Sequence, residues 1–492
     1  MGKVRLPDQT KTQEASAIKN NIKSELLEHL FELIDKHRGA FRQERTFRRA
    51  KGLIIGELFS FARHTVTQGL LALGIKDGDW SAWYRLFSKA RFDEAELNEC
   101  LFCETLEHVA TTEPYVTAID GTSFHRSSLK MPGTSWLKDS RFAAFRPGIH
   151  RAQRFLHGAW LTPLEDGYSR AIPLRLLPAF PPKAIASEHP ARREWEAGLT
   201  YLEWVRATLD KHGRRQQPIL ALTDGAFDVL DLWRGLPQQT ILITRTARNR
   251  RLYWLPKPDP HPGPGRPLSY GECAPHPADW LHAGLRKWPK AQIPVRGQMR
   301  PMRYQVLGPF VRDGLPEIPL FLIVIKGMHK LVGKKKKHDK HKGPSFYLVS
   351  AVQSQGQWQL PLPIETILAW LWQRWEIEVA HREMKSGLGV GEKQCWNHRS
   401  AVLSVQWSTW VYAILLLAAY RTWGLCGGPA TPARWWPGAK RWSFTTMWRS
   451  YRAAFWGEPE FQALWTSTGD HWWEKEAWLA GLTNSVHAAA RI

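Results

Sequence analysis

The stretch LAWLWQRWEIEVAHREMKSG, residues 368–387, has the composition of an α-helix and carries a carboxylate flanked by two cations. Arg374, Glu378 and Lys385 follow one another at intervals of four and seven residues. Residues at those intervals lie on one face of an α-helix, so the stretch predicts that the three charges share a face. A salt-bridged surface helix has the same pattern, and this stretch alone leaves both interpretations open.

The other residues of this predicted helix are assigned to a charged, an apolar or a solvated side. Arg382 and His381 lie on or beside the charged face. The apolar strip next to that face, predicted to pack inward, consists of Trp372, Trp375 and Val379. Glu376 and Glu383 fall on the opposite side, so we predict that both are solvated.

The net charge indicates the kind of partner. The chain has 492 residues, with 68 Lys and Arg against 45 Asp and Glu, which gives a formal charge of +23. This excess indicates a polyanion, most often nucleic acid, although ribosomal and membrane-surface proteins share it. The length predicts about three domains.

Cysteine content and hydropathy predict a reduced, cytoplasmic protein. Five cysteines make no disulfide framework, and the Cys100-x-x-Cys103 pair has too few neighbouring ligands for a structural zinc. The N-terminal residues contain no apolar core of a secretory signal. Residues 402–420 are long enough to span a bilayer, but their polar side chains favour a buried core helix, so no membrane partner is expected.

The N-terminal hundred or so residues have a helical pattern. SELLEHLFELIDKH and AKGLIIGELFSFA both show apolar residues at three- and four-residue spacing. Between and beside them lies a basic cluster of Arg42, Arg45, Arg48, Arg49 and Lys51. The pattern fits a helical DNA-binding module, and it also fits a helical bundle with a charged surface.

At Tyr115 the pattern changes to that of strands. YVTAIDGTSF predicts a strand that ends in a turn at Asp120-Gly121. HGAWLTPLEDGYSRAIPLRLLP predicts a β-hairpin with its turn at residues 165–167, and residues 194–211 predict an amphipathic helix.

A second strand carries a second aspartate. Residues 219–222 predict a buried strand with Asp224-Gly225 just beyond its end, and a helix begins near Asp228. QTILITRTARN predicts a further strand that runs into Arg245. Asp-Gly is a common turn, so either aspartate alone is compatible with a structural role.

Residues 251–350 are predicted to be an insertion. A Pro- and Gly-rich segment is followed by the strand-like runs RYQVLGPFV, PLFLIVIKG and FYLVSAV. The basic tract HKLVGKKKKHDKHKG, residues 329–343, is predicted to be a solvated loop, with contact to DNA phosphates as the functional alternative.

Asp120, Asp224 and Glu378 together form a candidate metal site. Three carboxylates from two strand ends and one helix can hold two divalent ions about 3.5–4 Å apart, which activate a nucleophile at a phosphodiester. Oxygen ligands favour Mg²⁺ or Mn²⁺ over zinc. Arg374 and Lys385 would then contact DNA phosphates near the scissile bond.

These motifs resemble the DDE transposases of bacterial insertion sequences, in the branch with a β-strand insertion before the last acid. That branch carries Tyr-x2-Arg-x3-Glu-x6-Lys, and Arg374, Glu378 and Lys385 match it, while Leu371 stands at the tyrosine position. The settings AIDGTSF, LTDGAFD and GRPLSYG and the tail GLGVGEKQCW also resemble the family. The resemblance covers about residues 115–420.

The resemblance implies an α/β fold with an RNase H-like core, a β-strand insertion and a preceding helical domain that binds the ends of the element. It implies cleavage and strand transfer within a homodimeric DNA complex, with DNA contacts from Arg374, Lys385, Arg382 and Arg245. The expected domains are an end-binding domain, the first core part, the insertion, the second core part and a Trp-rich segment: 1–110, 111–250, 251–350, 351–423 and 424–492.

Two alternatives stay open. A stand-alone metal-dependent nuclease would cut DNA without joining ends. An inactive, repurposed DNA-binding protein would bind without cutting, and the leucine at position 371 favours that possibility slightly.

Overall fold

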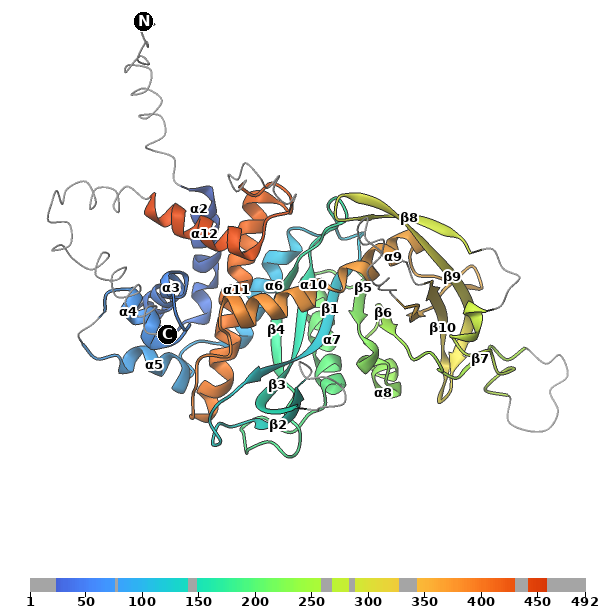
Figure 1. Cartoon of the computed structure of the whole chain (residues 1–492), viewed down its shortest axis with the longest axis horizontal. Coiled ribbons are helices and arrows are strands. Elements are labelled where there is room, and N and C mark those ends of the chain that lie inside the picture. Colours follow the sequence, from blue (N-terminus) through green and yellow to red (C-terminus); the bar gives the residue numbers. More distant parts are fainter. Residues whose placement is uncertain are drawn as a thin grey trace, which may run out of the picture. The chain divides into compact units, whose positions relative to one another are not determined.

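The computed structural model describes residues 24–75, 78–139, 148–257, 268–282, 288–326, 343–429 and 441–457 (Figure 1). The basic tract at 329–343 lies outside these residues, except for Gly343. The chain divides into two compact units. The helical unit is Met1–Glu96, Gly387–Lys393 and Val411–Ile492, and the sheet unit is Leu97–Ser386 and Gln394–Trp410.

The helical unit confirms the helical pattern of the N-terminal sequence. Leu30, Leu33, Ile54 and Leu58 are fully buried at the three- and four-residue spacing that predicted these helices. The elements, including the second half of α11, are α2 (Glu25–Lys36), η1 (His37–Ala40), α3 (Glu44–Phe59), α4 (Val66–Ala72), α5 (Ser81–Ser88), α11 (His398–Trp423) and α12 (Phe444–Trp456).

A buried ion pair ties the segment 387–393 to α3. Lys393 pairs with Glu57, both side chains are nearly inaccessible, and His64 Nδ1 lies 3.1 Å from a Glu57 carboxylate oxygen. The backbone N–H of His64 donates to Glu392 at 2.6 Å. Burial alone would raise the pKa of Glu57, but Lys393 and His64 outweigh it and hold the pKa below its usual value.

The sheet unit contains one large mixed sheet with helices. The strand order is β2-β3-β1-β5-β6-β11-β10-β9-β7, with β4 also on β3 and β8 on β9. The strands are β1 (Tyr115–His125), β2 (Thr134–Asp139), β3 (Gly148–Leu161), β4 (Ala171–Pro178), β5 (Ile219–Thr223), β6 (Thr240–Arg245), β7 (Leu252–Trp254), β8 (Lys290–Val295), β9 (Gln298–Arg312), β10 (Leu315–Ile325) and β11 (Ser345–Ser350), with a separate hairpin β12 (Val352–Ser354) and β13 (Gln357–Gln359).

The type of strand pairing changes twice across this sheet, from antiparallel to parallel and back to antiparallel. β1, β5 and β6 are parallel, whereas β3 pairs antiparallel with β1 and β4 antiparallel with β3. On the other side, β11 pairs antiparallel with β6, followed by β10 and β9. The strands of residues 251–350 therefore extend the same sheet beyond β6 (Figure 1).

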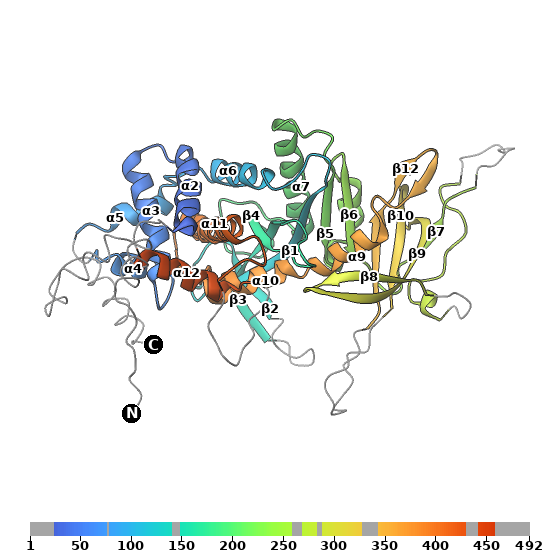
Figure 2. The same cartoon turned by 90° about the horizontal axis from the view of Figure 1, so that it is seen from above.

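Helices cover both faces of the sheet at β3 (Figure 2). The helices and turns of this unit are α6 (Glu94–Leu106), α7 (Glu194–Lys211), η2 (Gly225–Phe227), α8 (Leu230–Arg234), η3 (Asp279–Leu281), α9 (Ile364–Gln373), α10 (Glu376–Arg382) and the π-turn η4 (Glu383–Gly387). Gly158 faces α7, where an added Cβ would lie 2.2 Å from the Tyr201 ring. The preceding residue, His157, contacts His381 of α10, so α7 and α10 lie on opposite faces.

Several predicted elements are confirmed. Residues 194–211 form α7, and the predicted hairpin turn has Asp166 and Gly167 at positive φ angles of 51° and 71°. The predicted end of the first strand was wrong. β1 continues through Asp120 to His125, because β3 pairs with it as far as His125 and Ala152.

The long apolar helix is buried, as predicted. α11 is the one helix in the described ranges that is long and apolar enough to cross a membrane, and 94% of its apolar window is buried inside the protein. Its polar residues find internal partners: Gln406 donates to the Leu176 carbonyl and Thr409 to the Val405 carbonyl. The helix is thus a core element of this fold.

We expect Glu57→Gln to lower the free energy of unfolding by about 3–5 kcal/mol at pH 7, because it removes the carboxylate that pairs with the buried Lys393 ammonium. Since the folded state lowers the pKa of Glu57, its contribution is present above the ordinary glutamate pKa and is lost as the pH falls through the folded value. The difference between wild type and variant should shrink on acidification. Thermal unfolding across pH 3–8 measures it, with exposed Glu28→Gln as control. Equal stability at pH 7 would contradict this role.

Candidate active site

Two aspartates lie where the parallel pairing of β1 with β5 ends. β1 and β5 pair in register from Tyr115 with Ile219 to Ile119 with Thr223, so Asp120, within β1, and Asp224, just after β5, each come one residue after the last pair. Because parallel strands run in the same direction, this register brings the two aspartates to the same level of the sheet. Asp120 accepts a hydrogen bond from its neighbour's N–H at Gly121, and Asp224 caps η2 by accepting from the N–H of Ala226, both at 2.8 Å.

The third carboxylate comes from α10, which packs against β1 and β4. Glu378 accepts a hydrogen bond from Arg374 Nη2 at 2.5 Å, and Arg374 Nη1 lies 3.9 Å from Asp120 Oδ2. The guanidinium therefore joins the first and third acids across one helix and one strand. The structure thus places Arg374 beside Asp120 and Glu378, and the strand register places Asp224 next to Asp120.

The electrostatics of Asp120 reflect this crowding. Burial, together with the like charges of Asp224 and Glu378, raises the pKa of Asp120 to about 7, and Arg374 opposes the shift only in part. The cluster thus holds more negative charge than its neighbouring cation neutralises. A divalent ion would relieve this repulsion.

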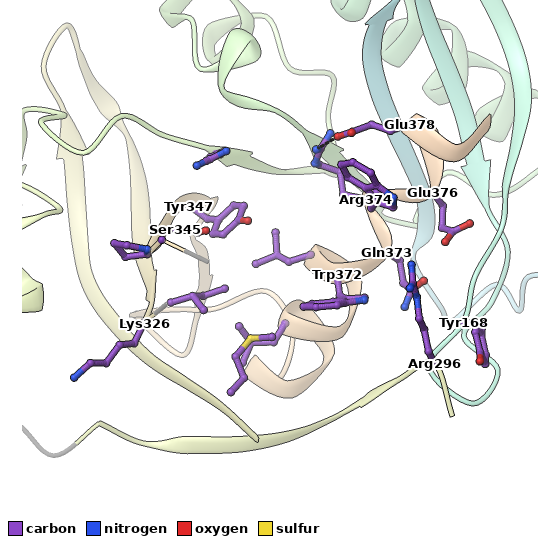
Figure 3. A pocket seen from close by; sticks show the side chains of 18 residues that line it. Tyr168, Arg296, Lys326, Ser345, Tyr347, Trp372, Gln373, Arg374, Glu376 and Glu378 are labelled. Atoms are coloured by element: carbon purple, nitrogen blue, oxygen red, sulfur yellow. Dashed lines mark hydrogen bonds and ion pairs between the residues drawn. The ribbon is translucent and has the colours of Figure 1, made fainter. Parts of the chain in front are cut away.

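The donor set fits Mg²⁺ or Mn²⁺, because it consists of carboxylate oxygens. Within the described ranges, however, no three His, Cys, Asp or Glu side chains are arranged to hold an ion. Glu378 points its oxygen at Arg374 (Figure 3). The chemistry of the donors fits a divalent metal, while binding one requires that Glu378 exchange its arginine partner for the ion.

The predicted single helix over residues 368–387 was wrong. α9 ends at Gln373, α10 begins at Glu376, and a π-turn follows from Glu383. The break at Arg374 and Trp375 interrupts the 3.6-residue period. As a result Trp375 is 52% exposed instead of packing inward.

The two glutamates predicted to be solvated are covered. Glu376 is 7% exposed, and Glu383 forms an ion pair of 3.3 Å with the buried Arg170. The sequence period places both on the side away from Glu378, and that side is protein-covered because α10 packs against β4. An exposed rear face was the wrong expectation for a helix that lies across a sheet.

Three of the four predicted DNA-contacting cations are exposed, and the fourth, Arg374, is mostly covered. Arg245, Arg382 and Lys385 are exposed, and the Lys385 ammonium lies 5.6 Å from the Phe124 ring centroid. Arg245 ends β6, next to the strand that carries Asp224. These residues are available for phosphate contacts near the carboxylates.

A cavity of about 530 Å³ opens beside Glu378 (Figure 3). Cations and large side chains line it together, including Arg245, Arg296, Lys326, Tyr347, Leu371, Trp372, Arg374 and Trp375. No sequence motif marked Arg296, Lys326 and Tyr347 as site residues. Arg296 lies in the turn between β8 and β9, Lys326 follows β10, and Tyr347 is on β11.

Two buried histidines lie beneath the cluster. His157 is the antiparallel partner of Asp120, and its ring centroid is 4.9 Å from that of His381. Burial and Lys385 lower the pKa of His157 to about 3, and burial lowers that of His381 well below its usual value. Both are therefore neutral at physiological pH and add no charge to the site.

We expect Asp120→Asn to raise thermal stability at pH 8 in metal-free buffer, by about 2 kcal/mol, because it removes the buried repulsion. The raised pKa of Asp120 means that the wild type loses stability as pH rises from about 4 to about 7. The advantage of the variant should therefore grow over this range. Thermal unfolding in EDTA measures it, with exposed Asp313→Asn as control. A variant less stable than wild type at pH 8 would contradict the repulsion.

Comparison with known proteins identifies the family. The profile described as DDE superfamily endonuclease matches residues 29–301, which is more than half of the chain and includes Asp120 and Asp224. Glu378 lies beyond the matched segment. No curated protein matches the chain. This family uses divalent metals to cleave DNA, which agrees with the carboxylate cluster. The chain belongs to the DDE superfamily endonuclease family.

Proposed function

We propose that the protein is a transposase that binds the ends of an insertion sequence, cleaves them and joins them to target DNA. The observation that carries this proposal is the convergence of Asp120, Asp224 and Glu378 in a DDE-family chain. Hydrolysis and end joining are both attacks by an oxygen nucleophile on a phosphodiester. One carboxylate-metal site can therefore serve both reactions.

The proposed core is RNase H-like. The sheet order β4-β3-β1-β5-β6, with β3 antiparallel and β1, β5 and β6 parallel, supports this assignment. It puts the first acid on the central strand and the second on its parallel neighbour. The strands from residues 251–350 would be the insertion of the branch with the Arg-x3-Glu-x6-Lys signature.

Asp120, Asp224 and Glu378 would hold two Mg²⁺ or Mn²⁺ ions. The ions, when bound, polarise the phosphodiester and stabilise the charge on its oxygens. The residues of the chain orient them: the strand register fixes the two aspartates and α10 supplies the glutamate. Arg374, released from Glu378, would donate to a phosphate oxygen.

The surroundings of the cluster support a DNA substrate. Arg245, Arg382 and Lys385 offer exposed charges for the backbone. The adjacent cavity combines arginines with Trp372 and Trp375, and cations with aromatic rings are the combination by which proteins bind unpaired nucleotides. Leu371 lines the same cavity, so it can contribute apolar contact there but no hydroxyl hydrogen bond.

The helical unit would bind the element ends. Arg42, Arg45 and Arg48 are exposed near the start of α3, where they can reach phosphates. We further propose that the protein acts as a homodimer in the cytoplasm and has the domain boundaries given above. Residues 424–492 have no assigned role in it.

The decisive experiment compares wild type with Glu378→Gln on a labelled fragment that carries the element's terminal repeat, with Mg²⁺. We expect the variant to lose cleavage and joining by about three orders of magnitude or more, and to keep end binding. Exposed Glu365→Gln in the first turn of α9 is the matched control and should retain activity. Cleavage without joining by the wild type would favour a nuclease. Binding without cleavage, even with Mn²⁺, would favour an inactive DNA-binding protein.

Lys385→Ala should weaken the complex with terminal-repeat DNA and reduce the slope of log K against log salt by about one, because one phosphate contact is lost. Fluorescence anisotropy across a salt series measures this slope. Lys183→Ala, at an exposed position after β4, serves as control. An unchanged slope would remove Lys385 from the phosphate contacts.

A further inference from the structure

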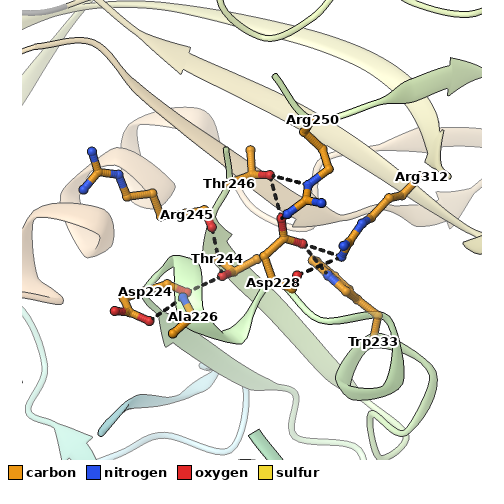
Figure 4. A network of polar contacts seen from close by, with 9 residues as sticks. All are labelled: Asp224, Ala226, Asp228, Trp233, Thr244, Arg245, Thr246, Arg250 and Arg312. Carbon is orange, nitrogen blue, oxygen red and sulfur yellow. Dashed lines mark hydrogen bonds and ion pairs between the residues drawn. The ribbon is translucent and has the colours of Figure 1, made fainter. Parts of the chain in front are cut away.

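Asp228 lies four residues after Asp224, and its surroundings differ from those of the proposed metal-site acids (Figure 4). The Asp228 side chain is fully buried and forms ion pairs with Arg250 at 2.5 Å and Arg312 at 2.6 Å. It also accepts hydrogen bonds from Thr246 Oγ1 at 2.7 Å and from Trp233 Nε1 at 3.2 Å. Both carboxylate oxygens are thus fully engaged.

The turn between the two aspartates is held at both ends from β6. Thr244 Oγ1 donates to the Asp224 carbonyl at 2.7 Å, and Thr246, two residues along the same strand edge, donates to Asp228. Arg312 Nη1 donates in addition to the Asp228 carbonyl at 3.1 Å. The backbone from Asp224 to Asp228 has therefore little freedom to move against the sheet (Figure 4).

The cations of this network come from the segment that separates the second and third acids. Arg312 is the last residue of β9, and Arg250 follows β6. A buried ion network of this kind contributes little net stability, because desolvation offsets the attraction. We therefore attribute to this ion network the role of fixing the backbone geometry of the turn between Asp224 and Asp228.

We propose that Asp228, clamped by Arg312 and Arg250, is a positioning residue that fixes the turn carrying Asp224 in the orientation needed to bind a divalent ion. This inference rests on the proposed metal site. Because Arg312 lies on β9, the strands after β6 would help to hold Asp224 in place. Asp228 itself contacts neither metal nor DNA, because its oxygens are occupied within the protein.

Mn²⁺ binding by isothermal titration tests the proposal without requiring activity. We expect Asp228→Asn to raise the Mn²⁺ dissociation constant about 10–100-fold, the range for residues that orient metal ligands. The matched control is Glu57→Gln, which also removes a buried carboxylate from its cationic partner but lies in the helical unit. The control should lose stability and keep the wild-type Mn²⁺ affinity. Equal affinities in folded Asp228→Asn and wild type would overturn the positioning role.

If Asp228→Asn does not fold, a less disruptive variant and its control test the same positioning role. Thr246→Val removes the hydrogen bond that Thr246 donates to Asp228 and the one that it accepts from Arg250, and it should weaken Mn²⁺ binding about fivefold. Thr208→Val removes one buried hydrogen bond on α7 and should leave it unchanged. Wild-type affinity in Thr246→Val would overturn the positioning role. A wild type that binds no Mn²⁺ would instead refute the proposed metal site itself.

Discussion

The parallel pairing of β1 with β5 is the constraint on which the site depends. Its register ends with Ile119 opposite Thr223, so Asp120 and Asp224 leave the paired region side by side. A slip of one residue would turn one side chain to the other face of the sheet. The apolar residues that fix the register, such as Ile119 and Leu222, are almost completely buried. The packing of these apolar residues in the core therefore also fixes where the two aspartates lie.

Concentrating carboxylates at one sheet edge has an electrostatic cost that is visible in the raised pKa of Asp120. Arg374 offsets part of this cost, because it lies between the first and third acids. In the proposed function a metal ion takes its place beside Glu378. Asp228, by contrast, is locked between two arginines, and its charge is used to hold backbone. Asp224 and Asp228, four residues apart, thus have different proposed roles, because Asp224 is partly exposed and Asp228 is buried.

The segment Gly387–Lys393 belongs to the helical unit. Its first residue, Gly387, is the last residue of the π-turn, and Lys393 is buried against Glu57 of α3. The chain therefore passes from the helix that carries Glu378 into the unit proposed to bind DNA ends within a few residues.

The sequence by itself determined the mixed α/β class, the boundaries of α7, the hairpin turn at Asp166, the buried helix α11 and the pairing of Arg374 with Glu378. These features follow from periodicity, from turn chemistry or from a motif with fixed spacing, which are all local. The tertiary structure alone decided that the helix breaks at Arg374 and that Glu376 and Glu383 are covered. It also decided that His157 pairs with Asp120, that Arg296 lines the cavity beside Glu378, and that Arg250 and Arg312 clamp Asp228. Those features depend on packing between segments far apart in the chain, and residue spacing within one segment carries no information about such packing.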